Sequence, residues 1–98
     1  MSPDTAATLR AFLVEGVEHG YANPAHIDGV AVGGKTGTAE VGPGQTPHAW
    51  FIGLAPADAP RLAIAVVFEH GGSGSEVATP AGREVLRVAL DAYPPQRR

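Results

Sequence analysis

The sequence contains no cysteine, which excludes a disulfide-stapled scaffold, a thiolate zinc site and a cysteine nucleophile. Basic residues are scarce, since 7 Lys and Arg stand against 10 Asp and Glu for a formal net charge of −3. Nucleic acid and anionic lipid attract basic surfaces, so we expect neither as the main partner. The longest apolar run, Leu62–Phe68, is too short to span a membrane, and the residues from Met1 to Asp4 are not typical of a secretory signal.

The length of 98 residues, of which 44% are hydrophobic, predicts a single domain. The 13 glycines and 9 prolines fall in clusters between periodic segments, as is typical of loops. No internal repeat is present. We expect residues 1–98 to form one unit with a short tail at 94–98.

Two segments have helical periodicity. The first is Pro3–His19, with Ser2 as its N-terminal cap and Gly20 as its end. The second runs from about Val77 to Tyr93. Apolar residues recur three and four positions apart in both helices, and we expect them to face the core. These residues are Ala6, Leu9, Phe12, Leu13 and Val17 in the first helix, and Val77, Ala81, Val85, Val88 and Ala92 in the second.

Three strands are predicted between the helices, at about 30–40, 48–55 and 61–70. The connections are too short for parallel crossovers, so neighbouring strands should be antiparallel. The third strand is apolar on both faces, and we expect both faces to be covered. The sequence therefore predicts an α+β fold, in the broad α/β class, with three layers: a helix, three antiparallel strands and a second helix.

Lys35 is the only lysine of the protein and lies in a glycine-rich segment, Gly33–Glu40. One interpretation is a solvated lysine on an edge strand. Another is a phosphate-binding loop, because Gly29–Thr36 satisfies G-x-x-x-x-G-K-[ST]. That motif requires a helix beginning at the lysine, and the glycines and the proline after Thr36 are unfavourable for one.

The segment Gly71–Ser75 lies between the third strand and the second helix, as the nucleophile elbow of a hydrolase does. The elbow needs a glycine where Ser75 stands, and it needs parallel strands. We therefore expect a turn in which Ser75 or a neighbouring serine caps the helix.

The third interpretation is the K-T-G element of serine acyltransferases, Lys35-Thr36-Gly37. It is followed by Thr38-Ala39-Glu40, by the strand His48–Pro56 and by the apolar strand Leu62–His70. This arrangement resembles the C-terminal portion of the penicillin-binding protein transpeptidase domain, of the β-lactamase-like superfamily. The resemblance extends over nearly the whole chain.

The resemblance implies a role for each residue of this motif. Lys35 would supply a positive field and contact the catalytic serines, and the hydroxyls of Thr36 and Thr38 would hold the carboxylate of a peptidoglycan stem peptide or a β-lactam. Gly37 would admit the substrate close to the strand, and the Thr38 amide would form half of the oxyanion hole. We expect no cofactor, and we expect no metal, because the histidines His19, His26, His48 and His70 are scattered along the sequence. The resemblance implies an extracytoplasmic, membrane-anchored parent protein.

The departures from the family pattern concern the nucleophile. The single lysine already belongs to K-T-G, so the chain has no Ser-x-x-Lys, and it has no Ser-x-Asn. We therefore expect a C-terminal segment of a longer domain, in which Met1 is an internal methionine. We expect it to be inactive alone, with the missing N-terminal part of the domain as its partner. The alternative is a non-catalytic module that acts through its sheet edge.

Overall fold

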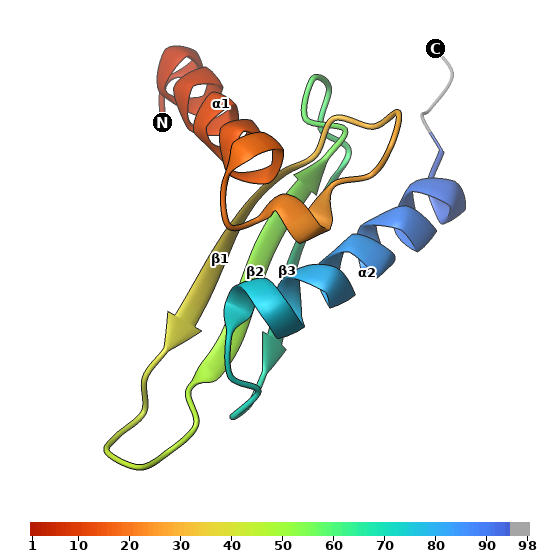
Figure 1. Ribbon diagram of the computed structural model, residues 1–98. Coiled ribbons are helices and arrows are strands. Elements are labelled where there is room, and N and C mark those ends of the chain that lie inside the picture. Colours follow the sequence, from red (N-terminus) through yellow and green to blue (C-terminus); the bar gives the residue numbers. More distant parts are fainter. Residues whose placement is uncertain (95–98) are drawn as a thin grey trace.

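The computed structural model describes residues 1–94. The three strands lie side by side, and a long helix lies near each end of the chain (Figure 1). The elements are α1 (Pro3–His19), η1 (Asn23–Ala25), β1 (Gly33–Ala39), β2 (His48–Ala55), β3 (Leu62–Phe68), a π-helical turn η2 (Gly74–Ala78) and α2 (Thr79–Ala92). The predicted tail at 94–98 lies, apart from Pro94, outside the described residues.

Helix α1 begins and ends where the sequence predicts. The Thr5 amide donates to the Ser2 hydroxyl at 3.1 Å, which satisfies one of the unpaired amides of the first turn. At the other end the Gly20 amide donates to the Gly16 carbonyl at 3.1 Å. Of its predicted apolar face only Val17 is fully buried, and Phe12 is exposed. The predicted face is confirmed for Val17 and for Leu13, which lies beside Gly33, and is wrong for Leu9 and Phe12, because α1 meets the sheet only near its C-terminal end.

The sheet has the order β1-β2-β3, and both pairs are antiparallel, as predicted. Strand β1 begins at Gly33, three residues later than expected. Gly29, with φ of 78°, forms a tight turn that brings Val30 back to pair with Ile27. Val30 therefore belongs to the turn before the strand.

Helix α2 presents a different face to the sheet from the one predicted. Its fully buried residues are Thr79, Gly82 and Leu86, whereas Val85 and Val88 are 47% and 55% exposed. The π-helical turn before α2 holds one residue more than an α-helical turn. The predicted face continues from Val77 with the period of an α-helix. The extra residue rotates the residues that follow, so the residues that pack on the sheet differ from the predicted ones.

The serines of the turn do not cap α2, so that prediction was wrong. The hydroxyls of Ser73 and Ser75 lie 3.0 Å apart and bind each other. The helix continues directly from the π-helical turn, whose last amides already have intrahelical partners. No unpaired amide therefore remains here for a serine hydroxyl to cap.

The core is centred on Phe51 of β2, which is fully buried. Three glycines make room for its ring: Gly34 on β1, Gly53 on β2 and Gly82 on α2. A Cβ atom at Gly34 would lie 2.6 Å from the ring, and one at Gly53 would lie 2.7 Å from it. The aromatic ring therefore joins two strands and one helix, and burying a side chain of this size contributes about 1.5–3 kcal/mol.

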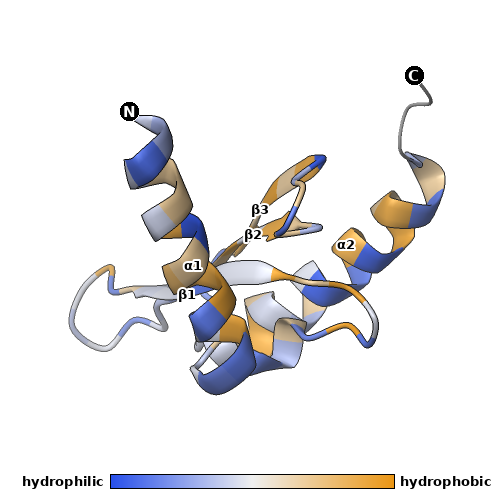
Figure 2. Cartoon of the chain, turned by 90° about the horizontal axis from the view of Figure 1, so that it is seen from above, coloured by the Kyte–Doolittle hydropathy of each residue, from blue (hydrophilic) through white to orange (hydrophobic). Residues whose placement is uncertain are grey.

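The opposite face of the sheet carries apolar residues that nothing in the described chain covers. Side chains alternate between the faces of a strand, which places Ile52 and Val67 opposite to Phe51. Ile52 and Val67 are 47% and 45% exposed. Leu13 of α1 reaches this face only at its corner, beside Gly33. The prediction that both faces of β3 are covered is therefore wrong for this chain, and Figure 2 shows hydrophobic residues along β2 and β3.

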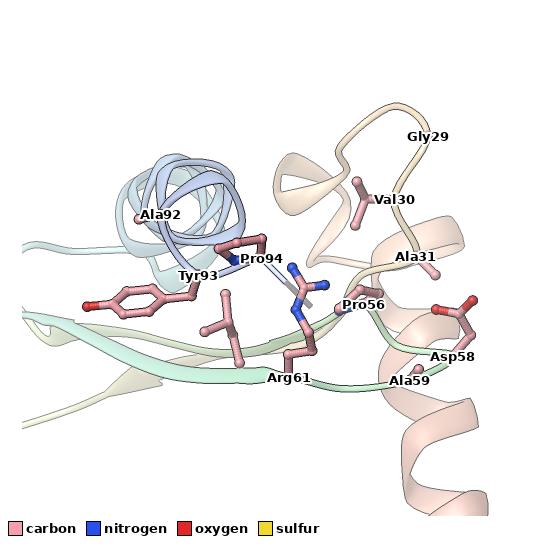
Figure 3. Close-up of a pocket in the computed structure, with 11 residues that line it drawn as sticks. Gly29, Val30, Ala31, Pro56, Asp58, Ala59, Arg61, Ala92, Tyr93 and Pro94 are labelled. Atoms are coloured by element: carbon pink, nitrogen blue, oxygen red, sulfur yellow. The ribbon is translucent and has the colours of Figure 1, made fainter. Parts of the chain in front are cut away.

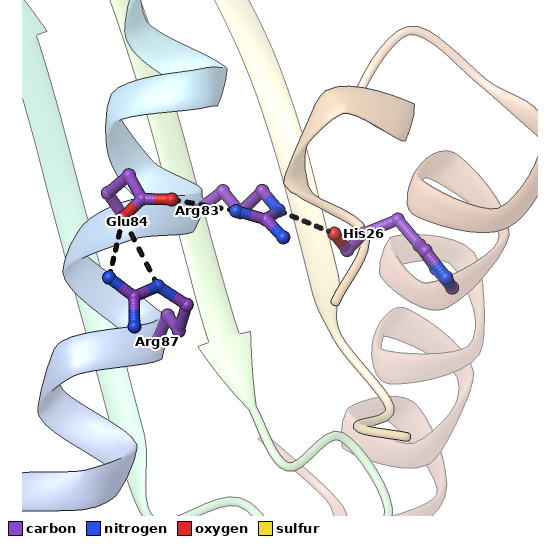
Figure 4. Close-up of polar contacts among 4 residues, drawn as sticks. All are labelled: His26, Arg83, Glu84 and Arg87. Atoms are coloured by element: carbon purple, nitrogen blue, oxygen red, sulfur yellow. Dashed lines mark hydrogen bonds and ion pairs between the residues drawn. The ribbon is translucent and has the colours of Figure 1, made fainter. Parts of the chain in front are cut away.

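A polar cluster fastens α2 to the loop before β1 (Figure 4). The Arg83 guanidinium donates to the His26 carbonyl at 2.9 Å and pairs with Glu84 at 2.7 Å. Arg87 pairs with Glu84 from the next turn at 2.9 Å. Hydrogen bonds and charge from Arg87, with a smaller contribution from Arg83, lower the pKa of Glu84 below its ordinary value.

The fit around Phe51 gives a first testable prediction. Replacing Gly82 by Ala should destabilise the protein, because the new methyl group overlaps the ring, and overpacking of this kind costs about 1–3 kcal/mol. Helix propensity alone predicts the opposite result, because alanine stabilises a helix relative to glycine. Urea denaturation measures the change in the free energy of unfolding. In a Phe51→Leu background the same substitution should become neutral or favourable, and equal losses in both backgrounds would contradict the packing argument.

The lowered pKa of Glu84 gives a second prediction. Its folded-state pKa lies below the unfolded value, so its contribution to stability is present above the unfolded pKa and is lost as pH falls through the folded one. Glu84→Gln should therefore reduce the melting temperature slightly at pH 7, and the difference from wild type should shrink as acidification protonates the Glu84 carboxylate in the folded protein. Glu18→Gln, on the exposed surface of α1, is the control.

Candidate functional site

The residues of the K-T-G segment lie in the middle of β1, an edge strand of the sheet. Strand β2 pairs with one edge of β1, and the other edge is free along its second half within the described chain. Helix α1 approaches only the beginning of the strand, where Gly16 lies against the Gly34 carbonyl. The backbone from Lys35 onward is therefore open to an added strand.

Lys35 is exposed and projects from the uncovered face of the sheet, on the same side as Ile52 opposite it. Its ammonium group donates to the Thr36 carbonyl at 2.7 Å. That bond holds the only lysine of the protein close to the strand backbone. The positive charge thus lies beside the open edge of β1.

Thr36 and Thr38 project from the face that α2 covers, because they alternate with Lys35. Thr36 is half-buried and Thr38 is exposed. The Thr38 hydroxyl accepts a hydrogen bond of 3.1 Å from the Gly74 amide. The structure therefore places Lys35, Thr36, Gly37 and Thr38 consecutively on β1. The two threonine hydroxyls lie on one face of the strand and the lysine ammonium group lies on the other.

Gly37 lies where three segments meet. It pairs with Trp50 of β2, and a Cβ atom at Gly37 would lie 3.3 Å from the Trp50 Cβ. Gly74 of the π-helical turn packs against the backbone of the same residue pair from the other face. Reasoning from the sequence did not find Gly74 and Thr79 as neighbours of the motif. They are 36 or more positions away, and nothing in the local pattern links them to it.

A small hollow lies between the end of α1 and β1, with Lys35 and Thr36 in its wall and a volume of about 210 Å³. A larger one, of about 870 Å³, lies beside the beginning of β3 and includes Arg61 and Asp58 (Figure 3). An extended peptide adds to a strand edge and needs no deep cavity, so the larger hollow does not compete with β1 as the site.

The structure excludes the other two interpretations of the glycine-rich segments. A phosphate-binding loop needs a helix that begins at the lysine, whereas Lys35 lies inside a strand that continues to Ala39 and then turns. A nucleophile elbow needs parallel strands, and β3 is antiparallel to its neighbour β2. Residues 1–94 contain no cluster of three or more potential metal-ligating His, Asp or Glu side chains. No helix in the same range has the length and hydrophobicity to cross a membrane.

The fold and the site define a class of protein. An antiparallel sheet whose open edge strand carries a K-T-G sequence, backed by a terminal helix, is typical of the serine acyltransferases that have K-T-G among their motifs. The family model of the penicillin binding protein transpeptidase domain matches residues 1–87. The chain belongs to this family.

Individual relatives agree with this assignment. The chain is 43% identical over 102 residues to the peptidoglycan D,D-transpeptidase PbpA of Mycobacterium tuberculosis, a match that covers 96% of this chain and 21% of that protein. The D,D-transpeptidase domain from Eggerthella lenta superimposes with a TM-score of 0.85 at 40% identity, over 94% of this chain and 21% of that one. The ceftriaxone acyl-enzyme complex of penicillin-binding protein A from M. tuberculosis has a TM-score of 0.83 at 42% identity, and the match covers 92% of this chain and 22% of that one.

The chain therefore spans about a fifth of the length of the curated relatives that it matches. The matched part is the C-terminal portion of those relatives. Their D,D-transpeptidase activity is that of the whole proteins, which carry four-fifths of their sequence outside the region of similarity.

Proposed function

We propose that this chain is the C-terminal segment of a peptidoglycan D,D-transpeptidase, and that β1 is the strand on which the acyl-donor stem peptide or a β-lactam is held. The observation that carries the proposal is the open edge of β1, with the only lysine of the protein and two threonine hydroxyls along it. An extended peptide pairs with such an edge through its backbone. Peptidoglycan lies outside the cytoplasmic membrane, so we propose that the parent protein works there.

The proposed roles follow the chemistry of each group. The Lys35 ammonium stabilises negative charge near the scissile carbonyl, and the hydroxyls of Thr36 and Thr38 donate to the substrate carboxylate. Gly37 leaves the backbone accessible, and the Thr38 amide provides one donor for the oxyanion. Acyl transfer also needs a nucleophile, and this chain has no serine in a Ser-x-x-Lys sequence. The nucleophile therefore has to come from the region of the domain that precedes this segment.

A penicillin-labelling experiment tests this proposal. The chain alone should not be labelled by a fluorescent penicillin, because it lacks the nucleophile. A chimera in which the chain replaces the matching C-terminal part of M. tuberculosis PbpA should be labelled. Lys35→Ala should then slow labelling by about 10²–10³, the usual loss when one stabilising donor is removed.

The control variant is Arg61→Ala, which removes the same charge just before β3, on the opposite edge of the sheet from β1, and should leave the labelling rate unchanged. An unlabelled chimera that is folded by circular dichroism would contradict the proposed function. Labelling of the chain alone would contradict the assignment of the nucleophile to the preceding region.

The uncovered face of the sheet supports a partner for this segment. Trp50, Ile52 and Val67 expose apolar surface on the face that carries Lys35, and β3 has an unpaired edge next to them within the described chain. Exposed apolar strands of this kind mark interaction surfaces. We propose that the N-terminal part of the transpeptidase domain covers this face and pairs with β3. The same surface supports the second candidate function, a non-catalytic module that binds through its sheet edge.

A stability measurement tests whether the N-terminal part of the domain covers this face. The N-terminal part of the PbpA transpeptidase domain, added as a separate polypeptide, should stabilise this chain, by about 2.7 kcal/mol at a concentration one hundred times the dissociation constant. Ile52→Glu should abolish the gain, and Ala59→Glu, which adds the same charge in the loop after β2, should preserve it. Each variant is compared with itself alone. A gain equal in both variants would show that the uncovered face is not the interface.

A further inference from the structure

The π-helical turn Gly74–Ala78 lies directly against the K-T-G strand. The side-chain direction of Gly74 points at the backbone of Gly37 and at the Trp50 carbonyl, which a Cβ atom would approach to 2.6 Å. No other residue type fits at this position without moving the strand. The turn therefore sets the position of the β1 backbone next to the substrate edge.

A chain of hydrogen bonds runs from the interior to the Thr38 hydroxyl. Thr79 is fully buried, and its hydroxyl donates to the Gly74 carbonyl at 2.7 Å. The Thr79 amide donates to the same carbonyl. On its other side, the Gly74 amide donates to the Thr38 hydroxyl at 3.1 Å. Thr79 therefore fixes the position of Gly74, and the Gly74 amide in turn binds the Thr38 hydroxyl.

The direction of these bonds determines what the Thr38 hydroxyl can do. A hydroxyl has one proton to donate and two lone pairs that accept. Because the Gly74 amide occupies a lone pair, the proton is available on the exposed side of Thr38. An ionised carboxylate only accepts, so it binds best to a hydroxyl whose proton already points outward.

We propose that Gly74 and Thr79 are positioning residues for carboxylate recognition, and that they act by orienting the Thr38 hydroxyl as a donor. This inference rests on the proposed function of β1 as the substrate strand. The ligand class is an extended acyl donor with a terminal carboxylate, or a β-lactam that carries the equivalent carboxylate. Neither Gly74 nor Thr79 touches the ligand; both act through Thr38.

The test uses the PbpA chimera with Thr79→Val, which preserves the shape of the side chain and removes the hydroxyl. Its concentration for half-maximal acylation by benzylpenicillin should rise about tenfold, the usual effect of losing a hydrogen bond to a charged group. The limiting acylation rate should stay within about twofold of the wild type, because the reacting atoms are untouched. Thr79→Ser retains the hydroxyl and should restore wild-type binding.

A second readout separates orientation from general loss of structure. The chimera should prefer benzylpenicillin over its methyl ester, which lacks the carboxylate charge. Thr79→Val should reduce this preference about tenfold by weakening the carboxylate contact. A purely structural defect would weaken both compounds equally and leave the preference unchanged, which would overturn the inference.

The outcomes for the two proposals differ. A folded wild-type chimera that is not acylated overturns the proposed function, and with it the inference. A wild-type chimera that is acylated, with Thr79→Val unchanged in both readouts, overturns the inference alone. If Thr79→Val does not fold, amide exchange in this chain decides: the Gly74 amide should exchange much more slowly than the Gly44 amide in the exposed loop, and equal rates would overturn the inference.

Discussion

The contact between Phe51 and the three glycines around it is the interaction on which the rest of the structure depends. Gly34, Gly53 and Gly82 let the ring lie between the sheet and α2 with no side chain in the way. If α2 were held further from the sheet, the turn before it would not reach β1. The amide that meets the Thr38 hydroxyl is part of that turn, so the geometry of the site depends on a packing contact several residues away.

The two faces of the sheet differ in how well they are covered, and this difference agrees with the fact that the chain matches only part of its relatives. One face has a packed core against α2, whereas the other exposes Ile52, Val67 and Trp50. A face of this apolar character is usually buried in a folded domain. The chain covers about a fifth of its relatives, and the proposed partner of the bare face is part of the remaining four-fifths.

The K-T-G segment shows why a motif has meaning only in its structural context. The eight residues ending at Thr36 satisfy the sequence requirements of a phosphate-binding loop, and the three beginning at Lys35 satisfy those of an acyltransferase strand. The first interpretation requires a helix from the lysine onward, and the second requires a strand. Glycines and a proline after Thr36 disfavour the helix, and the pairing of β1 with β2 completes the strand.

The sequence by itself determined the order of the two α-helices and three strands, the antiparallel pairing, the ends of α1 and the position of the motif on β1. These features depend on local rules: periodicity, capping, and connections too short for a crossover. The sequence did not predict the short helices η1 and η2. Only the tertiary structure decided which face of α2 is buried, that Gly34 serves packing, and that Gly74 and Thr79 lie beneath the motif. These features depend on contacts between residues far apart in the chain, and a π-helical turn shifts the helical phase in a way that a regular period does not anticipate.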